Sequence, residues 1–217
     1  MDWRKSIETA VVCLYNRCME MYVLDAAPLR GREAEFLSLL SPQRREKAER
    51  LRGESRLRSL AGGLLLRRFV GEGPFVPGLA GKPSLPGGRE FSLSHSGMLA
   101  VLAVDDAPVG ADTERIAPVR EALLPRVLSA EERQWLEPDP ERRFAFLWTR
   151  KEAVLKFLGC GIDRPLKELV VLPGSVPAPE GRPVWLHTVE YGGYMISAAS
   201  AEDAVFTPAA VTAEDLL

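Results

Sequence analysis

Apolar residues along the chain occur in short runs that are separated by turn-forming residues. Residues 21–24 form a first run, and residues 90–105 contain two more on either side of a Ser-Gly turn. This pattern predicts one strand, followed later by a strand, a turn and a strand. Between them, residues 42–51 and 57–70 are predicted helices, and the Ser-Pro pair before the first is typical of an N-cap and helix start.

The second half of the chain repeats this order loosely. Residues 109–116 predict a strand, residues 128–136 a short helix, and residues 140–159 a long helix that ends at glycines. The segments SGMLAVLAVDD and GGYMISAASAED share one pattern, in which glycine is followed by an apolar strand and then by acidic residues. This similarity indicates two related halves.

We therefore predict the α+β class, with two similar subdomains joined near residues 105–108. Residues 1–20 precede the first predicted strand and form an N-terminal extension. Residues 21–106 are the expected N-terminal subdomain, and residues 107–217 are the expected C-terminal subdomain.

The composition is that of an ordinary globular protein, with 46% hydrophobic and 27% charged residues. No run of about 18 apolar residues is present, so we expect no membrane span. The N-terminus lacks the long apolar core and cleavage site of a secretory signal. Cys13, Cys18 and Cys160 form no CxxC pair, so we expect reduced thiols and a cytoplasmic location.

Charge is spread unevenly along a chain whose net charge is −2. The basic segment, residues 42–68, holds nine Lys or Arg residues and three Glu residues. Such a segment favours an anionic ligand or partner. The alternative is a solvated helix face with i,i+4 ion pairs such as Glu46–Arg50 and Glu54–Arg58.

Two carboxylates are predicted to share one face of the strand over residues 109–116. Asp112 and Glu114 are two positions apart, and residues i and i+2 of a strand point the same way. Their mutual repulsion favours a hard cation such as Mg²⁺ between them. The alternative is a solvent-facing strand edge with Arg115 nearby.

The long predicted helix carries ionisable residues in and beside its apolar face. Lys151 lies in the middle of that face, Glu152 at its edge, and Lys156 one turn beyond Glu152. A lysine at the centre of a buried face needs a partner. The alternative is a snorkelling Lys151 with Glu152–Lys156 as an ordinary i,i+4 pair. The apolar face comprises Phe144, Leu147, Trp148, Leu155 and Leu158.

The sequence FSLSHSG places His95 in a turn that is rich in serine and glycine. Ser94, Ser96 and the amides of the turn are donors suited to phosphate. The chain has no GxSxG motif, and adjacent Ser and His residues in a turn do not form a nucleophile–base pair. The alternative for a lone histidine in a turn is a purely structural role.

Read in order, the segments GKPSLPG, FSLSHSG, VGADTER and FLWTRKEAVLKFLGCGI resemble the 4′-phosphopantetheinyl transferases, and most closely the larger, surfactin synthetase-activating type. SPQRREKAERL and RLRSLAGGLLLRR are similar to the N-terminal helices of that family. The resemblance runs from about residue 21 to the C-terminus. Ala111 and Thr113 replace bulkier aliphatic residues of the family, and Arg115 replaces a common lysine, so no functional group is lost.

The resemblance implies an enzyme that moves the phosphopantetheine arm of coenzyme A onto a serine of an apo acyl or peptidyl carrier protein. Adenosine 3′,5′-bisphosphate is the implied by-product. The implied fold has two similar α/β halves about a pseudo-twofold axis, with coenzyme A in the cleft between them. The implied carriers of fatty acid, polyketide, non-ribosomal peptide and siderophore pathways all remain open.

The resemblance also implies roles for individual residues. Asp112, Glu114 and Glu152 match the Mg²⁺ site, which grips the pyrophosphate. Lys156 matches a catalytic lysine at the phosphates, and Lys151 lies beside them. The residues that match positions around the adenosine and its 3′-phosphate are Arg44, Lys47, Arg58, Lys82, Ser94 and His95.

The base that deprotonates the carrier serine is expected to be Glu152, or a water that it orients. Glu132 is a second candidate by its position in the family. Its alternative is structural, because residues 129–132 read as a capping box, with Ser129 at the N-cap and Glu132 three positions later.

Two other function classes remain open from the residues alone. A nucleic-acid-binding module would use the basic segment, although that segment lacks interleaved aromatic residues. A metal-dependent hydrolase would cleave coenzyme A or a related nucleotide without a carrier protein. The favoured transferase is expected to act as a monomer with Mg²⁺, and to bind neither nucleic acid nor a membrane; Mg²⁺ and Mn²⁺ are not distinguished.

Overall fold

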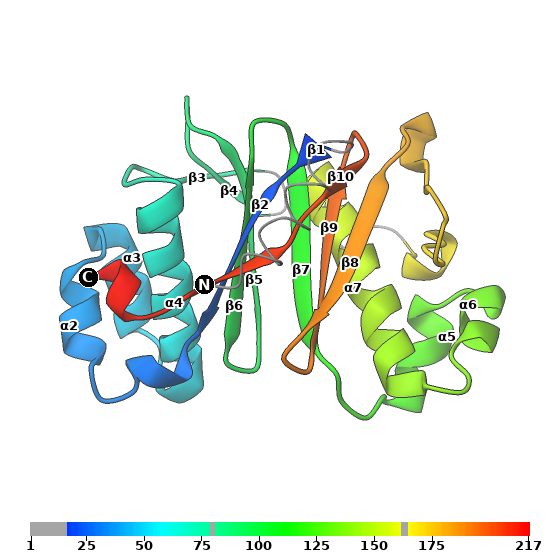
Figure 1. Ribbon diagram of the computed structural model, residues 1–217, viewed down its shortest axis with the longest axis horizontal. Helices are drawn as coiled ribbons and strands as arrows, with labels where there is room; N and C mark the ends of the chain where they lie inside the picture. The colour runs from blue at the N-terminus through cyan, green and yellow to red at the C-terminus, as the bar shows by residue number, and fades with distance from the viewer. Residues whose placement is uncertain (1–16, 79–80, 162–164) are drawn as a thin grey trace, which may run out of the picture.

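The computed structural model describes residues 17–78, 81–161 and 165–217. The predicted N-terminal extension therefore lies, up to residue 16, outside the described residues. Strands fill the middle of the molecule, with α2–α4 on one side and α5–α7 on the other (Figure 1). Each side pairs one long helix with a β-sheet, mixed in the first half and antiparallel in the second, so the predicted α+β class is confirmed.

The N-terminal sheet has four strands in the order β11-β2-β6-β5. β6 runs antiparallel to both β2 and β5, whereas β11 runs parallel to β2. All seven residues of β6 are buried because the strand lies in the interior of the sheet and is covered on both faces. The strands are β2 (Glu20–Asp25), β5 (Glu90–Ser96), β6 (Leu99–Asp105) and β11 (Pro208–Val211).

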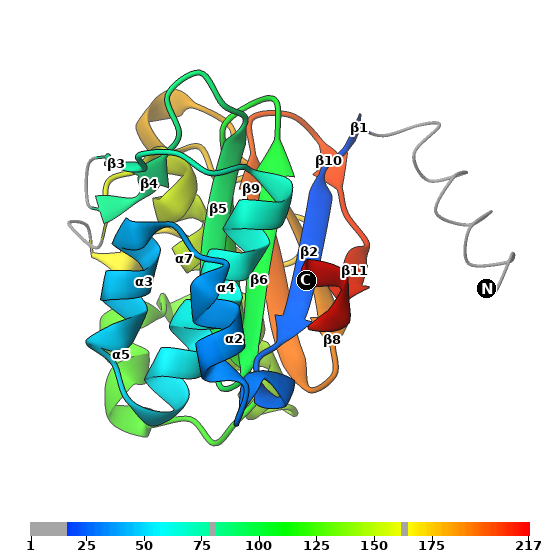
Figure 2. The same cartoon turned by 90° about the vertical axis from the view of Figure 1, so that its left-hand side faces the viewer.

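Three helices cover one face of this sheet, as Figure 2 shows. They are α2 (Glu33–Ser38), α3 (Pro42–Glu49) and α4 (Gly53–Phe69). The leucine-rich middle of α4 is buried against β6, β2 and β5. The basic residues of α3 stay on its outer side because the helix buries only Ala48 fully. This leaves their side chains free to line a cleft.

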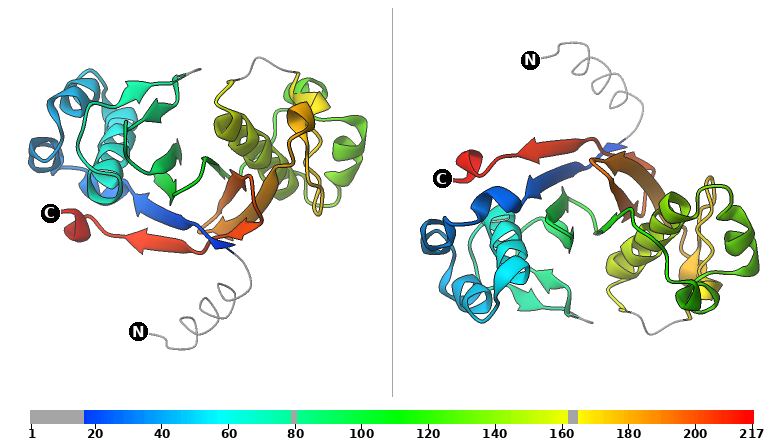
Figure 3. Two further views of the ribbon diagram at one scale, coloured as in Figure 1. Left: turned by 90° about the horizontal axis from the view of Figure 1, so that it is seen from above. Right: turned by 90° about the horizontal axis from the view of Figure 1, so that it is seen from below.

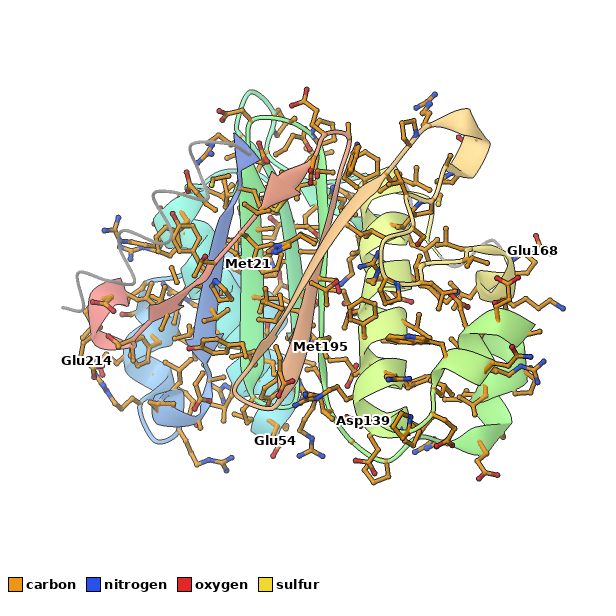
Figure 4. The ribbon with its side chains drawn as sticks, turned by 45° about the vertical axis from the view of Figure 1, so that its right-hand side comes forward. Met21, Glu54, Asp139, Glu168, Met195 and Glu214 are labelled. Carbon is orange, nitrogen blue, oxygen red and sulfur yellow. The ribbon has the colours of Figure 1, made fainter. Side chains whose placement is uncertain are left out.

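The C-terminal sheet has three antiparallel strands in the order β7-β9-β8. The long helix α7 (Pro140–Leu158) packs on β7 and β9. Asp139 caps its first turn (Figure 4), and Gly159 ends it in the left-handed conformation with φ 68°. The other elements are β7 (Val109–Arg115), β8 (Trp185–Tyr191), β9 (Tyr194–Ser200), α5 (Leu124–Val127) and α6 (Ala130–Trp135).

Short elements complete the described part of the chain. Four two-residue strands form two small pairs, which join β1 to β10 and β3 to β4. These strands are β1 (Arg17–Cys18), β3 (Val76–Pro77), β4 (Pro83–Ser84) and β10 (Ala204–Val205). The 3₁₀ helices are η1 (Ala27–Leu29), η3 (Glu121–Leu123), η4 (Leu166–Glu168), η5 (Pro179–Gly181) and η6 (Glu214–Leu216).

A shared apolar cluster joins the two sheets. Figure 3 shows the two sheets from above and from below. Alternate residues of β2 and β6, such as Met21 and Val101, meet Ala111 of β7 and Ile196 of β9 in this cluster. The opposite faces of the sheets carry α4 and α7. The polar residues that alternate with the cluster along β7, Asp112 and Glu114, therefore belong to the face that carries α7.

The C-terminal segment returns to the first half. β11 extends the N-terminal sheet, and Ala213 and Leu216 join the core under α4. The sequence assigns this segment to the second half, since nothing local in Pro-Ala-Ala-Val indicates a parallel partner almost 190 residues away. The predicted strands β2, β5, β6 and β7 and helices α3, α4, α6 and α7 are all observed.

Two local predictions need correction. Cys18 is disulfide-bonded, so the expectation that all three cysteines are reduced thiols is wrong, although Cys160 is a free cysteine. α3 begins at Pro42 as predicted, but the Ser41 side chain does not cap it. The Ser41 hydroxyl is buried and has no hydrogen-bond partner within the described residues.

Gly110 on β7 allows α7 to approach the strand unusually closely. A Cβ atom at this position would lie 2.0 Å from the carbonyl oxygen of Ala153 and 2.4 Å from the amide nitrogen of Phe157. Both are backbone atoms of α7, so no side-chain rotation could relieve the overlap. The glycine of the VGADTER segment is thus required by packing, and it sets the distance between Asp112 and the helix.

We expect Gly110→Ala to lower the free energy of unfolding by about 3 kcal/mol, the upper end of the usual cost of overpacking. The measurement is urea unfolding followed by tryptophan fluorescence. Gly63→Ala is the matched control, because a Cβ atom there meets only the flexible tip of Leu40, at 3.0 Å. Alanine also has the higher helix propensity by about 1 kcal/mol. Equal losses in the two variants would contradict the packing argument.

Candidate functional site

A cleft of about 740 Å³ is lined mainly by the first half of the molecule, and Lys156 of α7 contributes to its wall from the second half. Its walls come from α3, from β5, from the segment before β4 and from the last turns of α7. A second pocket of about 270 Å³ continues it towards Glu152 and shares Lys156 with it. The side chains that line the larger space include Arg44, Lys47, Arg50, Phe75, Leu93, Ser94, His95 and Lys156.

The structure gathers most of the basic residues that the sequence predicts for the site. Arg44, Lys47 and His95 line the main cleft, and Arg58 joins them in an adjoining pocket of about 250 Å³. Lys82 lies on the wall of the pocket that continues the cleft towards Glu152. These residues come from α3, α4, β5 and the segment before β4, so only the fold brings them together.

Individual contacts fix three of these cations. The Arg44 guanidinium lies 5.0 Å from the centre of the Phe75 ring. The Arg58 Nη1 donates to the carbonyl of Gly97 at 3.2 Å, and the Lys82 Nζ donates to the carbonyl of Val109 at 2.8 Å. The Lys82 contact crosses from the first half to the second, so it also holds the two halves together.

The cations of the cleft are not fully neutralised by the protein. Burial lowers the pKa of both Arg44 and Lys82. The pKa of His95 is lowered by partial burial and also by the positive charges of Arg58, Lys156 and Lys47. Crowded, partly desolvated cations of this kind favour a bound polyanion.

The rest of the basic segment serves the surface and the local chain. Arg45 donates to the carbonyls of Leu37 and Ser38, which ties the end of α2 to α3. Glu46 and Arg50 form an exposed ion pair one helical turn apart. The predicted i,i+4 ion pairs Glu46–Arg50 and Glu54–Arg58 are therefore present, whereas an anionic ligand for the segment stays a prediction.

Asp112 lies at the junction of the two halves. Its Oδ1 accepts a hydrogen bond from the Ser94 hydroxyl at 2.6 Å and pairs with the Lys156 ammonium, also at 2.6 Å. Lys156 in turn donates to the Ser94 hydroxyl at 2.9 Å. Asp112 is only 6% exposed. Its negative charge is therefore stabilised by Ser94 of β5 and Lys156 of α7.

Two further carboxylates lie on the same side of the C-terminal sheet. Glu114 accepts a hydrogen bond from the Ser96 hydroxyl at 2.7 Å. Glu152 is half-buried, and its Oε1 is fully buried without a hydrogen-bond partner among the residues that the structure describes. Burial and the nearby negative charge of Asp112 raise the pKa of Glu152, whereas Lys156 lowers it. A buried, unsatisfied carboxylate oxygen beside a second carboxylate fits a cation.

No ready-made metal ligand set is present in residues 17–78, 81–161 and 165–217. No group of three or more His, Cys, Asp or Glu side chains in this part of the chain is arranged to hold a metal ion. Asp112 instead has the Lys156 ammonium as its counter-ion. Asp112, Glu114 and Glu152 therefore carry oxygen ligands of the kind that a hard cation binds. In this structure, however, the three carboxylates are not arranged as a complete ligand set.

Glu132 and Lys151 lie apart from the other predicted site residues. Their side chains are 0% exposed, and the Lys151 Nζ lies 2.8 Å from the Glu132 Oε2. Lys151 also donates to the carbonyls of Leu166 and Leu169, and Glu132 accepts from the amides of Ser129 and Val171. The pair thus joins α6, α7 and the segment over residues 166–171, and the predicted capping box of Ser129 and Glu132 is present.

The surroundings of this pair disfavour the roles in catalysis and substrate binding that the sequence predicts for it. Burial lowers the pKa of Lys151, and the adjacent Glu132 carboxylate opposes that shift. Every charged atom named in the pair already has protein partners, so neither residue is free to reach a substrate in this structure. Glu152 is then the candidate base whose carboxylate faces a pocket.

Sequence reasoning did not identify two features of the site. Gly110 has no predicted role of its own within the VGADTER segment, although its missing side chain sets the position of α7. Ser96 was considered a phosphate donor, whereas its hydroxyl donates to Glu114. The period-two spacing of Ser92, Ser94 and Ser96 on one strand face was the available signal.

We expect Glu132→Gln to lower the free energy of unfolding by about 3–5 kcal/mol, because it leaves the buried Lys151 charge without its anion. The measurement is the urea midpoint at pH 7. Glu131→Gln, in the same helix but exposed, is the control and is expected to stay within about 0.5 kcal/mol. A stable Glu132→Gln protein with lost activity would instead favour a chemical role for Glu132.

None of the helices that the structure describes is both long and apolar enough to cross a membrane.

Comparison with known proteins identifies the family. A family model described as the 4′-phosphopantetheinyl transferase superfamily matches residues 108–201. The chain is similar to the 4′-phosphopantetheinyl transferase psf-1 of Bacillus pumilus, with 36% identity over 167 residues that cover 67% of this chain and 71% of that protein. It is 32% identical over 160 residues to the 4′-phosphopantetheinyl transferase Sfp of Bacillus subtilis strain 168, covering 66% and 71% of the two chains.

A solved structure, that of Thermotoga maritima holo-[acyl-carrier-protein] synthase, aligns with 43% of this chain and 61% of that chain, at 17% identity and a TM-score of 0.35. That similarity is too weak to carry an argument. The similarity to psf-1 and Sfp extends over about two thirds of the chain. The residues that match the family model, 108–201, span Asp112, Glu114, Glu152 and Lys156. The chain belongs to the 4′-phosphopantetheinyl transferase superfamily.

Proposed function

We propose that the protein transfers the 4′-phosphopantetheine group of coenzyme A to a serine of an apo acyl or peptidyl carrier protein and releases adenosine 3′,5′-bisphosphate. The observation that carries the proposal is the junction at Asp112, where a cationic cleft from the first half meets the carboxylates of the second. A substrate that carries several phosphates and requires a divalent cation matches both sides of this junction.

Coenzyme A is proposed to bind in the cleft between the halves. Arg44, Lys47, Arg58, Lys82, Ser94 and His95 are proposed to hold its adenosine and 3′-phosphate. Burial lowers the pKa values of Arg44, Lys82 and His95, and a bound anion would stabilise their charged forms, which supports this assignment.

Asp112, Glu114 and Glu152 are proposed to hold Mg²⁺. The support is the unpartnered Glu152 Oε1, together with the repulsion between Glu152 and Asp112. The cation would neutralise charge on the pyrophosphate as the bond to the leaving bisphosphate breaks. The ion is proposed as Mg²⁺ because the ligands are carboxylate oxygens.

Lys156 is proposed to stabilise negative charge on the transferred phosphoryl group. Its ammonium is partly exposed to the cleft and lies between Asp112 and Ser94. From this position it can give up one hydrogen bond to the protein and donate to a phosphate oxygen instead. Lysine suits this task as a compact point charge on a flexible stem.

Glu152 is proposed as the base that accepts the proton of the carrier serine. Its carboxylate lies on the wall of the pocket that continues the cleft, where the hydroxyl of the carrier serine could reach it. The serine oxygen then forms its bond to phosphorus as the bond to the bisphosphate oxygen breaks. In place of the roles predicted for them, Lys151 and Glu132 are proposed to hold α7 in position through their buried ion pair.

The oligomeric state and the subdomain boundaries belong to the same proposal. Both sides of the cleft come from one chain, so we propose that the protein works as a monomer. The subdomains are proposed to be residues 21–106 and 107–217, with the C-terminal segment packed back on the first. A cytoplasmic location and the absence of nucleic-acid and membrane partners are parts of the same proposal.

The test is an intact-mass assay with the protein, coenzyme A, Mg²⁺ and a panel of apo carrier proteins. A carrier that gains one phosphopantetheine, and does so only without EDTA, supports the proposal. Cleavage of coenzyme A with no modified carrier would replace it with a hydrolase, one of the alternatives that the sequence leaves open.

We expect Asp112→Asn and Glu152→Gln to reduce transfer by at least about 100-fold, since each removes a charge proposed to hold the cation. Initial rates on the best carrier would measure the loss. Glu141→Gln, an exposed change in the first turn of the same helix, is expected to keep full activity. Wild-type rates in either of the first two variants would refute the metal assignment.

A further inference from the structure

β5 and β7 run side by side at the boundary between the two sheets, but their backbones do not pair. β5 is the last strand of the N-terminal sheet and β7 the first of the C-terminal sheet, and no ladder joins these two described strands. The two halves of the site therefore meet along a line where the usual inter-strand hydrogen bonds are missing. We call this line the seam.

Three serines of β5 bridge the seam at regular intervals. The Ser92 hydroxyl accepts from the amide of Ala111 at 2.9 Å, and the Ser94 hydroxyl donates to Asp112 at 2.6 Å. The Ser96 hydroxyl donates to Glu114 at 2.7 Å and accepts from the amide of Arg115 at 3.1 Å. The same face of β5 thus reaches β7 at every second residue.

The three bridges differ in what they hold on the second strand. Ser92 contacts only the backbone of Ala111, as donor to its carbonyl at 3.4 Å and as acceptor from its amide. Ser96 contacts a carboxylate side chain as well as the backbone. Ser92 therefore serves as an internal comparison for a bridge that joins the strands without touching a carboxylate.

The hydrogen bonds of Glu114 leave one of its oxygens available. Within the described chain, Glu114 accepts from the Ser96 hydroxyl and from the amide of Arg115, and both bonds end at Oε1. Its Oε2 takes part in neither bond. A carboxylate that is fixed through one oxygen can present the other to a cation without losing its orientation.

The turn that carries Ser96 is itself fixed from both halves. Arg58 of α4 donates to the carbonyl of Gly97, and the Tyr194 hydroxyl of β9 accepts from the amide of Met98 at 3.4 Å. A Cβ atom at Gly97 would lie 2.6 Å from that hydroxyl, so the turn fits closely under Tyr194. Ser96 consequently has a defined position from which to orient Glu114.

We propose that Ser96 is a positioning residue that orients Glu114 for the divalent cation by holding its Oε1 across the seam. This inference rests on the proposed function, because it concerns the metal of that same site. The hydroxyl of Ser96 donates to Glu114 and accepts from the amide of Arg115, and these contacts assign it to Glu114 in this inference, in place of the phosphate-donor role that the sequence suggests.

The experiment measures Mn²⁺ binding to the purified full-length protein by the electron paramagnetic resonance signal of free Mn²⁺. We expect Ser96→Ala to weaken Mn²⁺ binding by about 10–100-fold, the usual effect of removing a hydrogen bond to a metal ligand. Ser96→Thr, which keeps the hydroxyl, should restore most of the affinity. The concentration of Mg²⁺ that gives half-maximal transfer should rise in Ser96→Ala, with kcat at saturating Mg²⁺ largely retained.

Ser92→Ala is the matched control for loss of a bridge. It should lower the urea midpoint, because a buried hydrogen bond is lost, while its Mn²⁺ affinity stays that of the wild type. Equal weakening of Mn²⁺ binding in Ser92→Ala and Ser96→Ala would overturn the inference, because the effect would then come from the seam as a whole.

The outcomes also separate this inference from the proposed function. If the wild type transfers phosphopantetheine with Mg²⁺ and Ser96→Ala binds Mn²⁺ as tightly as the wild type, the positioning role is wrong and the function stands. If the wild type binds no Mn²⁺ and transfers equally well in EDTA, the metal assignment and the positioning role both fail.

Discussion

The close approach of α7 to β7 is the constraint on which the rest of the site depends. It is possible only because residue 110 has no side chain to meet the backbone at Ala153 and Phe157. Glu152 directly precedes Ala153, and Lys156 directly precedes Phe157, so the contact that fixes the helix also fixes these two side chains. With α7 at this depth, the Lys156 ammonium reaches the Asp112 carboxylate two residues beyond the glycine.

The same helix carries two ion pairs whose surroundings give them different consequences. Lys151 points away from the cleft and is enclosed with Glu132 and two backbone carbonyls, so its charge is fully engaged and serves to fix α7. Lys156 is partly exposed and lines the cleft together with its partner Ser94, next to the buried Asp112. A pair of the first kind would lose several kcal/mol if a ligand disrupted it, whereas one of the second kind can exchange partners at little cost.

The sequence predicts the local features of this arrangement because they have local causes. Alternating and helical spacing locate β5, β6, β7 and α7, and the i,i+2 carboxylates locate one wall of the site. The partner of Lys151 was not predicted, since the central position of a lysine in an apolar face shows that an anion is needed but not which one. β11 was missed for a similar reason: its hydrogen bonds depend on β2, and its own four residues carry no strand pattern.

The two halves of the site carry complementary excesses of charge. The first half supplies cations whose pKa values are lowered, and the second supplies Glu152, whose pKa is raised beside Asp112. Each excess costs free energy, because the charged groups are partly desolvated. A phosphorylated ligand together with a divalent cation relieves both at once, the anion at the first wall and the cation at the second. The seam of serines matters for this reason, because it places β7, which carries Asp112 and Glu114, against β5 of the first half.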